Sequence, residues 1–161
     1  MLTMAAPITI AAGTTVMDLQ VADFNGDGKS DVVELTAGNP DKITVQLGNG
    51  DGTFQAGITS VATQSIVQPI EITVGDYNHD GKMDVATNNV FSIGVMFGNG
   101  DGTFQTAVVY PVGANAADLK SADLNHDGFT DLVTSSGGYG GTSQVLLNDG
   151  TGVFPTTKNV S

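Results

Sequence analysis

Hydrophobic and polar residues alternate in short runs along the chain, and Gly, Asn and Asp residues separate these runs. No window shows the 3.6-residue periodicity that is typical of a helix, whereas alternation between Gly-rich turns predicts β-strands. The sequence therefore predicts an all-β protein with three sets of four strands. The expected first strands are 18–23, 69–76 and 118–123, the second 32–33, 85–87 and 132–134, the third 43–47, 92–97 and 143–147, and the fourth 54–61, 104–112 and 154–160.

Two motifs recur along the chain at nearly the same period. The nonapeptide Asp-Phe-Asn-Gly-Asp-Gly-Lys-Ser-Asp at 23–31 returns in similar form at 76–84 and 123–131. The octapeptide Leu-Gly-Asn-Gly-Asp-Gly-Thr-Phe at 47–54 returns with Phe in first place at 97–104, and in a looser form at 147–154. Two independent motifs with one period indicate a threefold internal repeat, and four short strands in about 50 residues correspond to one β-propeller blade.

The repeat predicts a single domain over residues 1–161 with three tandem, four-stranded antiparallel blades. We place blade 1 at about 16–62, blade 2 at about 69–113 and blade 3 at about 116–160, after an additional N-terminal strand at 7–13. Closed propellers usually contain four to eight blades. We therefore expect the three blades to be part of a longer propeller or to assemble into a closed one. Two copies would make six blades, and cyclic symmetry makes this homodimer the favoured assembly.

The nonapeptide has the pattern Asp-x-Asn-x-Asp-Gly-x-x-Asp, which is typical of a calcium loop. Ca²⁺ prefers six to eight oxygen ligands, and the Gly at position 6 permits the tight turn that brings them together. Positions 1, 3, 5 and 9 supply side-chain oxygens and position 7 supplies its carbonyl, so the position-7 side chain is irrelevant to coordination. The candidate ligands of three Ca²⁺ ions are Asp23, Asn25, Asp27, Lys29 and Asp31; Asp76, Asn78, Asp80, Lys82 and Asp84; and Asp123, Asn125, Asp127, Phe129 and Asp131.

Two other interpretations of the nonapeptide are less satisfactory. Asn-Gly and Asp-Gly form turns without any metal, but turn formation explains only one or two residues of each loop. An EF-hand would use Glu34 at position 12, yet Thr87 and Thr134 stand there in the other repeats and the flanking segments are β-like. We expect Glu34 to be a solvent-facing strand residue.

The nonapeptide followed by the Gly-Asn-Gly-Asp-Gly-Thr-Phe turn resembles the FG-GAP/VCBS repeat family, which is related to the integrin α-subunit propeller. The resemblance covers about residues 7–160, although the turn at 148–152 departs from the pattern. It implies four-stranded blades with calcium in the hairpin between the first and second strands. It also implies an extracellular or cell-surface setting, often in adhesive or carbohydrate-related proteins.

The composition of the chain excludes several classes of binding partner. The chain has 15 Asp, two Glu, five Lys and no Arg, with a formal net charge of −12. No basic patch can form, which argues against nucleic acid and anionic membranes as partners. Without Cys there is neither a disulfide nor a thiolate metal site, and no apolar run approaches the length of a membrane span. No secretory signal can be identified at the start of the sequence.

Catalytic chemistry is not expected. The two His residues, His79 and His126, occupy the non-liganding fourth position of their loops, where we expect exposed turn residues. The irregular loops at 36–42, 88–92 and 135–142 are the candidate surface for a protein or carbohydrate ligand, with Tyr139 as a candidate for stacking on a sugar. The leading hypothesis is a calcium-binding module for extracellular binding or adhesion, in which calcium is structural. The alternatives are a purely structural spacer in a larger surface protein or, in third place, a propeller-based hydrolase or lyase.

Overall fold

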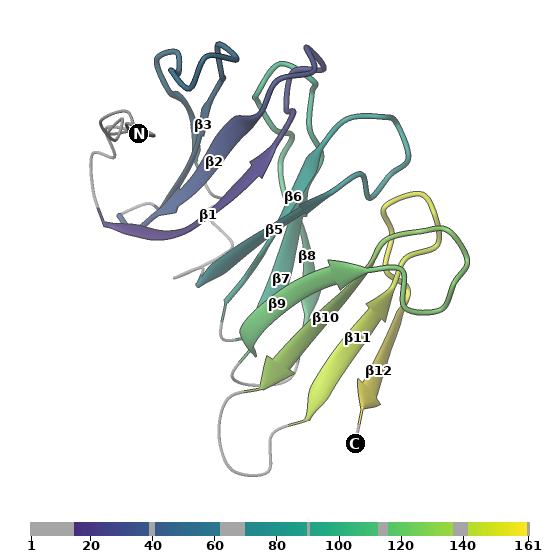
Figure 1. Ribbon diagram of the computed structural model, residues 1–161. Coiled ribbons are helices and arrows are strands. Elements are labelled where there is room, and N and C mark those ends of the chain that lie inside the picture. Colours follow the sequence, from purple (N-terminus) through teal and green to yellow (C-terminus); the bar gives the residue numbers. More distant parts are fainter. Residues whose placement is uncertain are drawn as a thin grey trace, which may run out of the picture.

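The computed structural model describes residues 15–38, 41–61, 70–89, 91–112, 116–136 and 142–160. Within these ranges every regular element is a β-strand, and the strands form three separate four-stranded antiparallel sheets (Figure 1). This confirms the predicted all-β fold with three antiparallel blades. The strands are β1 (Val16–Ala22), β2 (Asp31–Thr36), β3 (Lys42–Gln46) and β4 (Ile58–Val61); β5 (Glu71–Gly75), β6 (Asp84–Asn88), β7 (Ser92–Met96) and β8 (Val108–Pro111); and β9 (Ala116–Ala122), β10 (Asp131–Ser136), β11 (Ser143–Leu147) and β12 (Thr156–Val160).

Each sheet is an up-and-down meander, because consecutive strands pair in chain order. The three sheets fan out as an arc in which the first strands β1, β5 and β9 follow one another along one side (Figure 1). Strand reversal places the nonapeptide loops and the octapeptide turns at the same rim of each blade. In blade 1, for example, Gly50 of the turn lies against the side chain of Lys29 in the loop.

The fourth strands begin later than the alternation predicts. They start at Ile58, Val108 and Thr156, not at the preceding Phe of each repeat. In blade 1, Phe54 instead forms an isolated antiparallel bridge with Gly48, and Gln55 N donates to the carbonyl of Leu47 at 2.8 Å. The chain therefore closes its turn with these contacts before regular pairing starts. The additional strand predicted at 7–13 lies outside the described residues.

The hydrophobic core lies between blades. One cluster joins blades 1 and 2, and a second joins blades 2 and 3. Blade 2 is consequently covered on both faces, and every residue of β6 and β7 is buried. The first cluster contains Phe24, Val33, Leu35, Ile43, Val45, Ile72, Val85 and Met96, and the second contains Tyr77, Ala86, Ile93, Val95, Leu119, Leu132, Leu146 and Phe154.

The prediction that Glu34 faces solvent is wrong, because this side chain is 5% exposed. It lies in β2, in register with Leu19 of β1 and Thr44 of β3. All six residues of β2 are buried. Side chains on both faces of β2 are therefore buried. The alternation of hydrophobic and polar residues predicts only one buried face, so it could not reveal the burial of Glu34.

Candidate metal centre

Each nonapeptide forms the loop between the first and second strands of its blade. The loop reverses direction through left-handed backbone at positions 4 and 6. In loop 1 both positions are Gly, whereas in loops 2 and 3 position 4 is His79 or His126, with φ of 57° and 62°. His is one of the few residues with a side chain that adopts this conformation readily. Both His side chains are exposed, as expected for turn residues.

The carboxylate at position 1 organises each loop by accepting the backbone N–H groups of positions 5 and 6. Asp23 Oδ1 accepts Asp27 N at 3.2 Å, and its Oδ2 accepts Gly28 N at 2.8 Å. The other loops repeat this pair of bonds in the same positions. The distances are 3.1 and 2.9 Å from Asp76 to Asp80 N and Gly81 N, and 3.2 and 3.0 Å from Asp123 to Asp127 N and Gly128 N.

Positions 3 and 5 continue the same pattern. Asn25 Oδ1 accepts Asp27 N at 3.0 Å, and Asp27 Oδ1 accepts Lys29 N at 2.9 Å. Loops 2 and 3 contain the equivalent bonds at 2.9–3.1 Å. Three oxygen-bearing side chains in each loop are therefore held by the backbone of the same short segment, which pre-orients hard oxygen donors of the kind that Ca²⁺ prefers.

The aspartate at position 9 has a different environment. Asp31, Asp84 and Asp131 are fully buried at the start of the second strand. One oxygen of Asp84 accepts Tyr77 N and the other accepts Gly98 N, both at 2.8 Å. Asp31 and Asp131 bond in the same way to the position-2 N–H and to the N–H of the second octapeptide residue. This carboxylate therefore fastens the loop to the octapeptide turn.

Burial raises the pKa of Asp84 to about 6, against the lowering influence of the two backbone N–H groups. The neighbouring carboxylates Asp80 and Asp76 raise the pKa further. Loop 2 therefore concentrates negative charge around a poorly solvated carboxylate. A bound cation would relieve this repulsion.

The loops offer oxygen donors, the kind of ligand that a hard cation prefers. Their acidic side chains, however, do not converge on one point. Among the described residues, no three Asp, Glu or His side chains gather into one cluster. The position-9 bonds give a physical reason, since both oxygens are directed to backbone N–H groups. The prediction that this carboxylate closes the metal shell stays a prediction, and it would require a second lone pair on an oxygen that already accepts a hydrogen bond.

The side chain at position 7 forms an ion pair within its loop in two of the three repeats. Lys29 Nζ lies 2.9 Å from Asp27 Oδ2, and Lys82 Nζ lies 3.7 Å from Asp80 Oδ2. The hydrogen bond from Lys29 holds the pKa of Asp27 below its usual range. Loop 3 lacks this cation, because Phe129 instead packs edge-on against His79 at 4.9 Å between ring centroids. A metal would compete with lysine for a carboxylate in loops 1 and 2 only.

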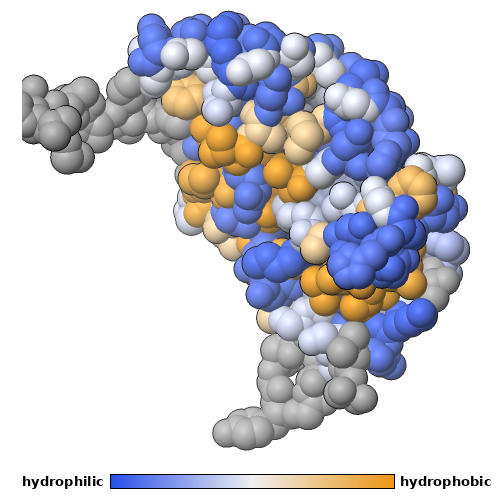
Figure 2. Space-filling view, turned by 45° about the vertical axis from the view of Figure 1, so that its right-hand side comes forward, coloured by the Kyte–Doolittle hydropathy of each residue, from blue (hydrophilic) through white to orange (hydrophobic). Residues whose placement is uncertain are grey.

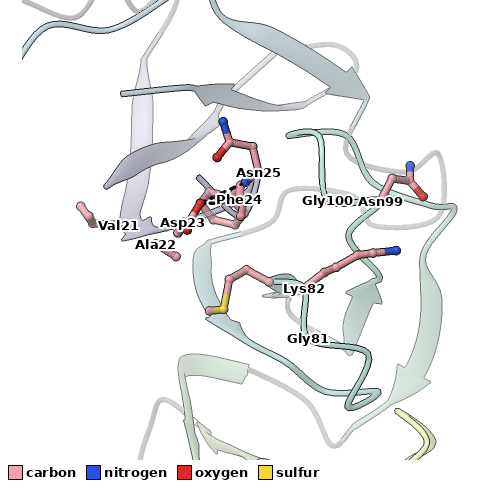
Figure 3. Close-up of a pocket in the computed structure, with 11 residues that line it drawn as sticks. Val21, Ala22, Asp23, Phe24, Asn25, Gly81, Lys82, Asn99 and Gly100 are labelled. Carbon is pink, nitrogen blue, oxygen red and sulfur yellow. Dashed lines mark hydrogen bonds between the residues drawn. The ribbon is translucent and has the colours of Figure 1, made fainter. Parts of the chain in front are cut away.

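Loops 1 and 2 also border a groove of about 690 Å³ (Figure 3). Asp23, Phe24 and Asn25 line the side that belongs to blade 1. Lys82 and Asn99 line the side that belongs to blade 2. Loop residues of both blades therefore line this groove.

Sequence reasoning missed the residues that join the blades. Each repeat has an acidic residue five positions before its loop, namely Asp18, Glu71 and Asp118, and this recurrence was a readable signal. In the sequence, Asn148 is visible only as part of the departure from the turn pattern. The structure shows Asn148 buried, with Nδ2 donating to the carbonyls of Tyr77 at 2.8 Å and Thr130 at 3.0 Å. The irregular turn thereby contributes an additional contact between blades 2 and 3.

The predicted ligand-binding loops are described only in part. Tyr139 lies outside the described residues, as do 39–40, 90, 137–138 and 140–141 in the same three loops. In the described part of the chain no helix long and apolar enough to span a membrane occurs.

Three meandering four-stranded sheets with acidic first hairpins define a protein built from β-propeller blades. A family model described as FG-GAP-like repeat matches residues 23–87, and one described as FG-GAP repeat matches residues 117–147. Together the matches cover more than half of the chain, which therefore belongs to the FG-GAP repeat family. FG-GAP repeats are propeller blades and typically occur in extracellular proteins. No curated protein matches the sequence.

Proposed function

We propose that this chain is a calcium-stabilised propeller module that serves extracellular binding or adhesion through a protein or glycan ligand. In this proposal, the three nonapeptide loops each take one Ca²⁺ ion. The ion is structural and holds the first hairpin of its blade, while the blades provide a rigid support for a binding surface. No catalytic role is assigned.

The observation that supports calcium most directly is the threefold repetition of the loop's hydrogen bonds. In all three loops, position 1 accepts the N–H groups of positions 5 and 6, position 3 accepts that of position 5, and position 5 accepts that of position 7. A merely polar turn does not require the same oxygens at the same places three times. Calcium would supply positive charge to carboxylates that otherwise repel one another.

Within each loop, the side chains of positions 1, 3 and 5 and the carbonyl of position 7 are the proposed ligands, and the position-9 carboxylate remains the predicted closing ligand. Loops 1 and 2 must release the lysine from the position-5 carboxylate when the ion binds, whereas loop 3 has no lysine to release. Because the unfolded chain has no preformed site, calcium binding would stabilise the folded state.

Binding or adhesion is supported by the family's usual setting and by the shape of the fold. Four-stranded blades place their irregular connections between the second and third strands opposite the acidic rim (Figure 1). Loops on a rigid scaffold are common binding surfaces. A screen of immobilised glycans and matrix proteins with the calcium-loaded chain tests this part of the proposal. Binding that Tyr139→Ala weakens would support it, whereas absence of binding would favour the structural spacer.

Thermal unfolding with calcium and with EDTA tests the metal. At free calcium 100 times the dissociation constant, each site adds about 2.7 kcal/mol, so three sites should raise the melting temperature by on the order of 10 °C or more. The triple variant Asp27→Asn, Asp80→Asn, Asp127→Asn should lose most of this difference. An equal melting temperature in calcium and EDTA would overturn the proposal.

A matched control changes three other exposed aspartates at the same rim. Asp51, Asp101 and Asp149 each cap their own turn by accepting a Thr hydroxyl and backbone N–H. Their triple replacement by Asn changes the net charge equally. This variant should retain the full difference between calcium and EDTA.

A further inference from the structure

The two junctions between blades use the same polar contact. Asp18 Oδ2 in blade 1 accepts Ile72 N of blade 2 at 3.0 Å. Glu71 Oε2 in blade 2 accepts Leu119 N of blade 3 at 2.6 Å. The acid always lies five residues before its own loop, and the donor lies four residues before the next loop. We call this contact the acid clasp.

Among the described residues, each end of the arc has one half of an acid clasp with no further blade to pair with. Leu19 N occupies the donor position in blade 1, and it donates to its own neighbour Asp18 at 2.8 Å. Asp118 occupies the acceptor position in blade 3, where its carboxylate pairs with Lys120 of the same strand and interacts with Glu71 of blade 2. The exposed end of blade 3 thus has an acceptor that matches the donor at the exposed end of blade 1.

Apolar side chains that are buried at the junctions between blades are exposed at the two ends of the arc. Leu19 is 50% exposed, whereas its equivalents Ile72 and Leu119 are each 1% exposed beneath the preceding blade. Met17 and Val21 are exposed beside Leu19 on β1. We call the surface formed by Met17, Leu19 and Val21 the leading face of blade 1. Figure 2 shows hydrophobic surface exposed between hydrophilic regions of the molecule.

Blade 3 carries the complementary surface. At the internal junctions, the turn Phe of one blade packs edge-on against the position-2 ring of the preceding blade, as Phe104 does with Phe24 and Phe154 with Tyr77. The position-2 residue of blade 3 is Leu124, which is 43% exposed. Val133 and Val145 are half-buried there, although their equivalents in blades 1 and 2 are buried. We call Leu124, Val133 and Val145 the trailing face.

We propose that the trailing face of one chain docks on the leading face of a second copy, and that two such junctions close a six-bladed ring. Asp118 then accepts Leu19 N of the partner copy, while Leu124 is covered by the partner's Phe54. The occupant is identified by complementarity, because one chain carries both the acceptor face and the donor face in the form used internally. A head-to-tail contact repeated around a twofold axis closes without leaving an end.

Disulfide trapping tests the register of this junction. Thr73 and Ser121 face each other across the internal junction, with their hydroxyl oxygens 2.9 Å apart. The equivalent pair between copies is Lys120 and Val21. Because the chain contains no Cys, the double variant Val21→Cys, Lys120→Cys should oxidise to a covalent dimer. Thr73→Cys, Ser121→Cys should form an internal bond, and Val21→Cys, Lys158→Cys should stay uncrosslinked between chains.

Mass in solution gives the second test. By light scattering, the unmodified chain should have twice its monomer mass. Leu19→Asp replaces an exposed side chain, so the monomer should keep its β circular-dichroism spectrum while association weakens by about 100-fold or more, since both junctions change. A monomeric chain without the 21–120 crosslink would overturn the proposal. A ladder of larger crosslinked species would overturn ring closure.

Discussion

The carboxylates at position 1 and position 9 of the same nonapeptide have opposite surroundings. Asp84 is fully buried and fastens the loop of blade 2 to the turn at Gly98. Asp76 lies eight residues earlier, in the loop itself, and accepts only the N–H groups of that loop. The motif therefore contains two parts, a buried acid that stabilises the fold and a more exposed acid group available to a metal. A shared sequence motif does not imply a shared role for its members.

Replacing the buried carboxylate should have the largest effect. Asp84→Ala leaves the N–H groups of Tyr77 and Gly98 buried without an acceptor, which should lower the free energy of unfolding by about 3–5 kcal/mol. Urea unfolding in EDTA measures this loss. The control Asp101→Ala removes an exposed turn acid and should leave the unfolding midpoint nearly unchanged. Equal midpoints for the two variants would contradict a structural role for position 9.

A change at position 1 should lower the free energy of unfolding less than a change at position 9, and this loss should be larger in calcium than in EDTA. Asp76→Asn keeps one carbonyl oxygen as an acceptor for the loop but removes a charge from the proposed site. We expect a small loss of stability in EDTA, and a calcium affinity of loop 2 reduced by at least about tenfold. Asp84→Asn should show the reverse, with most of its loss already present in EDTA. If the stability of Asp76→Asn and that of Asp84→Asn depended on calcium in the same way, the proposed difference between positions 1 and 9 would be contradicted.

The lysine at position 7 should weaken the calcium affinity of its loop. Lys29→Met removes the ammonium group that pairs with Asp27 at 2.9 Å while retaining an unbranched side chain beside Gly50. Calcium would then bind without displacing a cation, so loop 1 should bind it about two- to fivefold more tightly. Competition with a fluorescent chelator measures the change. The matched variant Lys158→Met should have no effect.

Removal of the acid clasp by Glu71→Gln should have the smallest effect on stability. This effect should be visible as a change in how the free energy of unfolding depends on pH. Burial, and then the hydrogen bond shared with Asp118, raise the pKa of Glu71, while Leu119 N and Lys120 act against them. The folded chain therefore holds this proton more tightly than the unfolded chain. As pH falls from above the raised pKa to the ordinary value near 4.5, the chain should gain stability relative to Glu71→Gln. A difference that shrinks over this window would contradict the assignment.

The blade architecture could be predicted because its signals are local. Alternation, the Gly-rich turns and the repeat period lie within stretches of about 50 residues, and they correctly indicated three antiparallel sheets. Features that depend on neighbouring blades could not be read in this way. Glu34 is buried although its pattern suggested exposure, and the fourth strands begin only after Phe54 and Phe104 have bridged back to their turns.

The sequence predicts the candidate donors but not the hydrogen bonds that each of them makes. Spacing selects five candidate donor positions in each loop. It could not show that Asp31 would bond to Gly48, 17 residues away, because that contact depends on how the third strand returns. The ion pair of Lys29 with Asp27 is likewise absent from the prediction, because the loop pattern assigns only the carbonyl of position 7 to the metal.

Isothermal titration of calcium into the chelator-treated, folded chain tests the central claim most directly. We predict a stoichiometry of three ions per chain, lost in the variant that carries Asn at positions 27, 80 and 127 and retained in the variant that carries Asn at 51, 101 and 149. An absence of binding, or equal binding by both variants, would contradict the assignment of these loops to calcium.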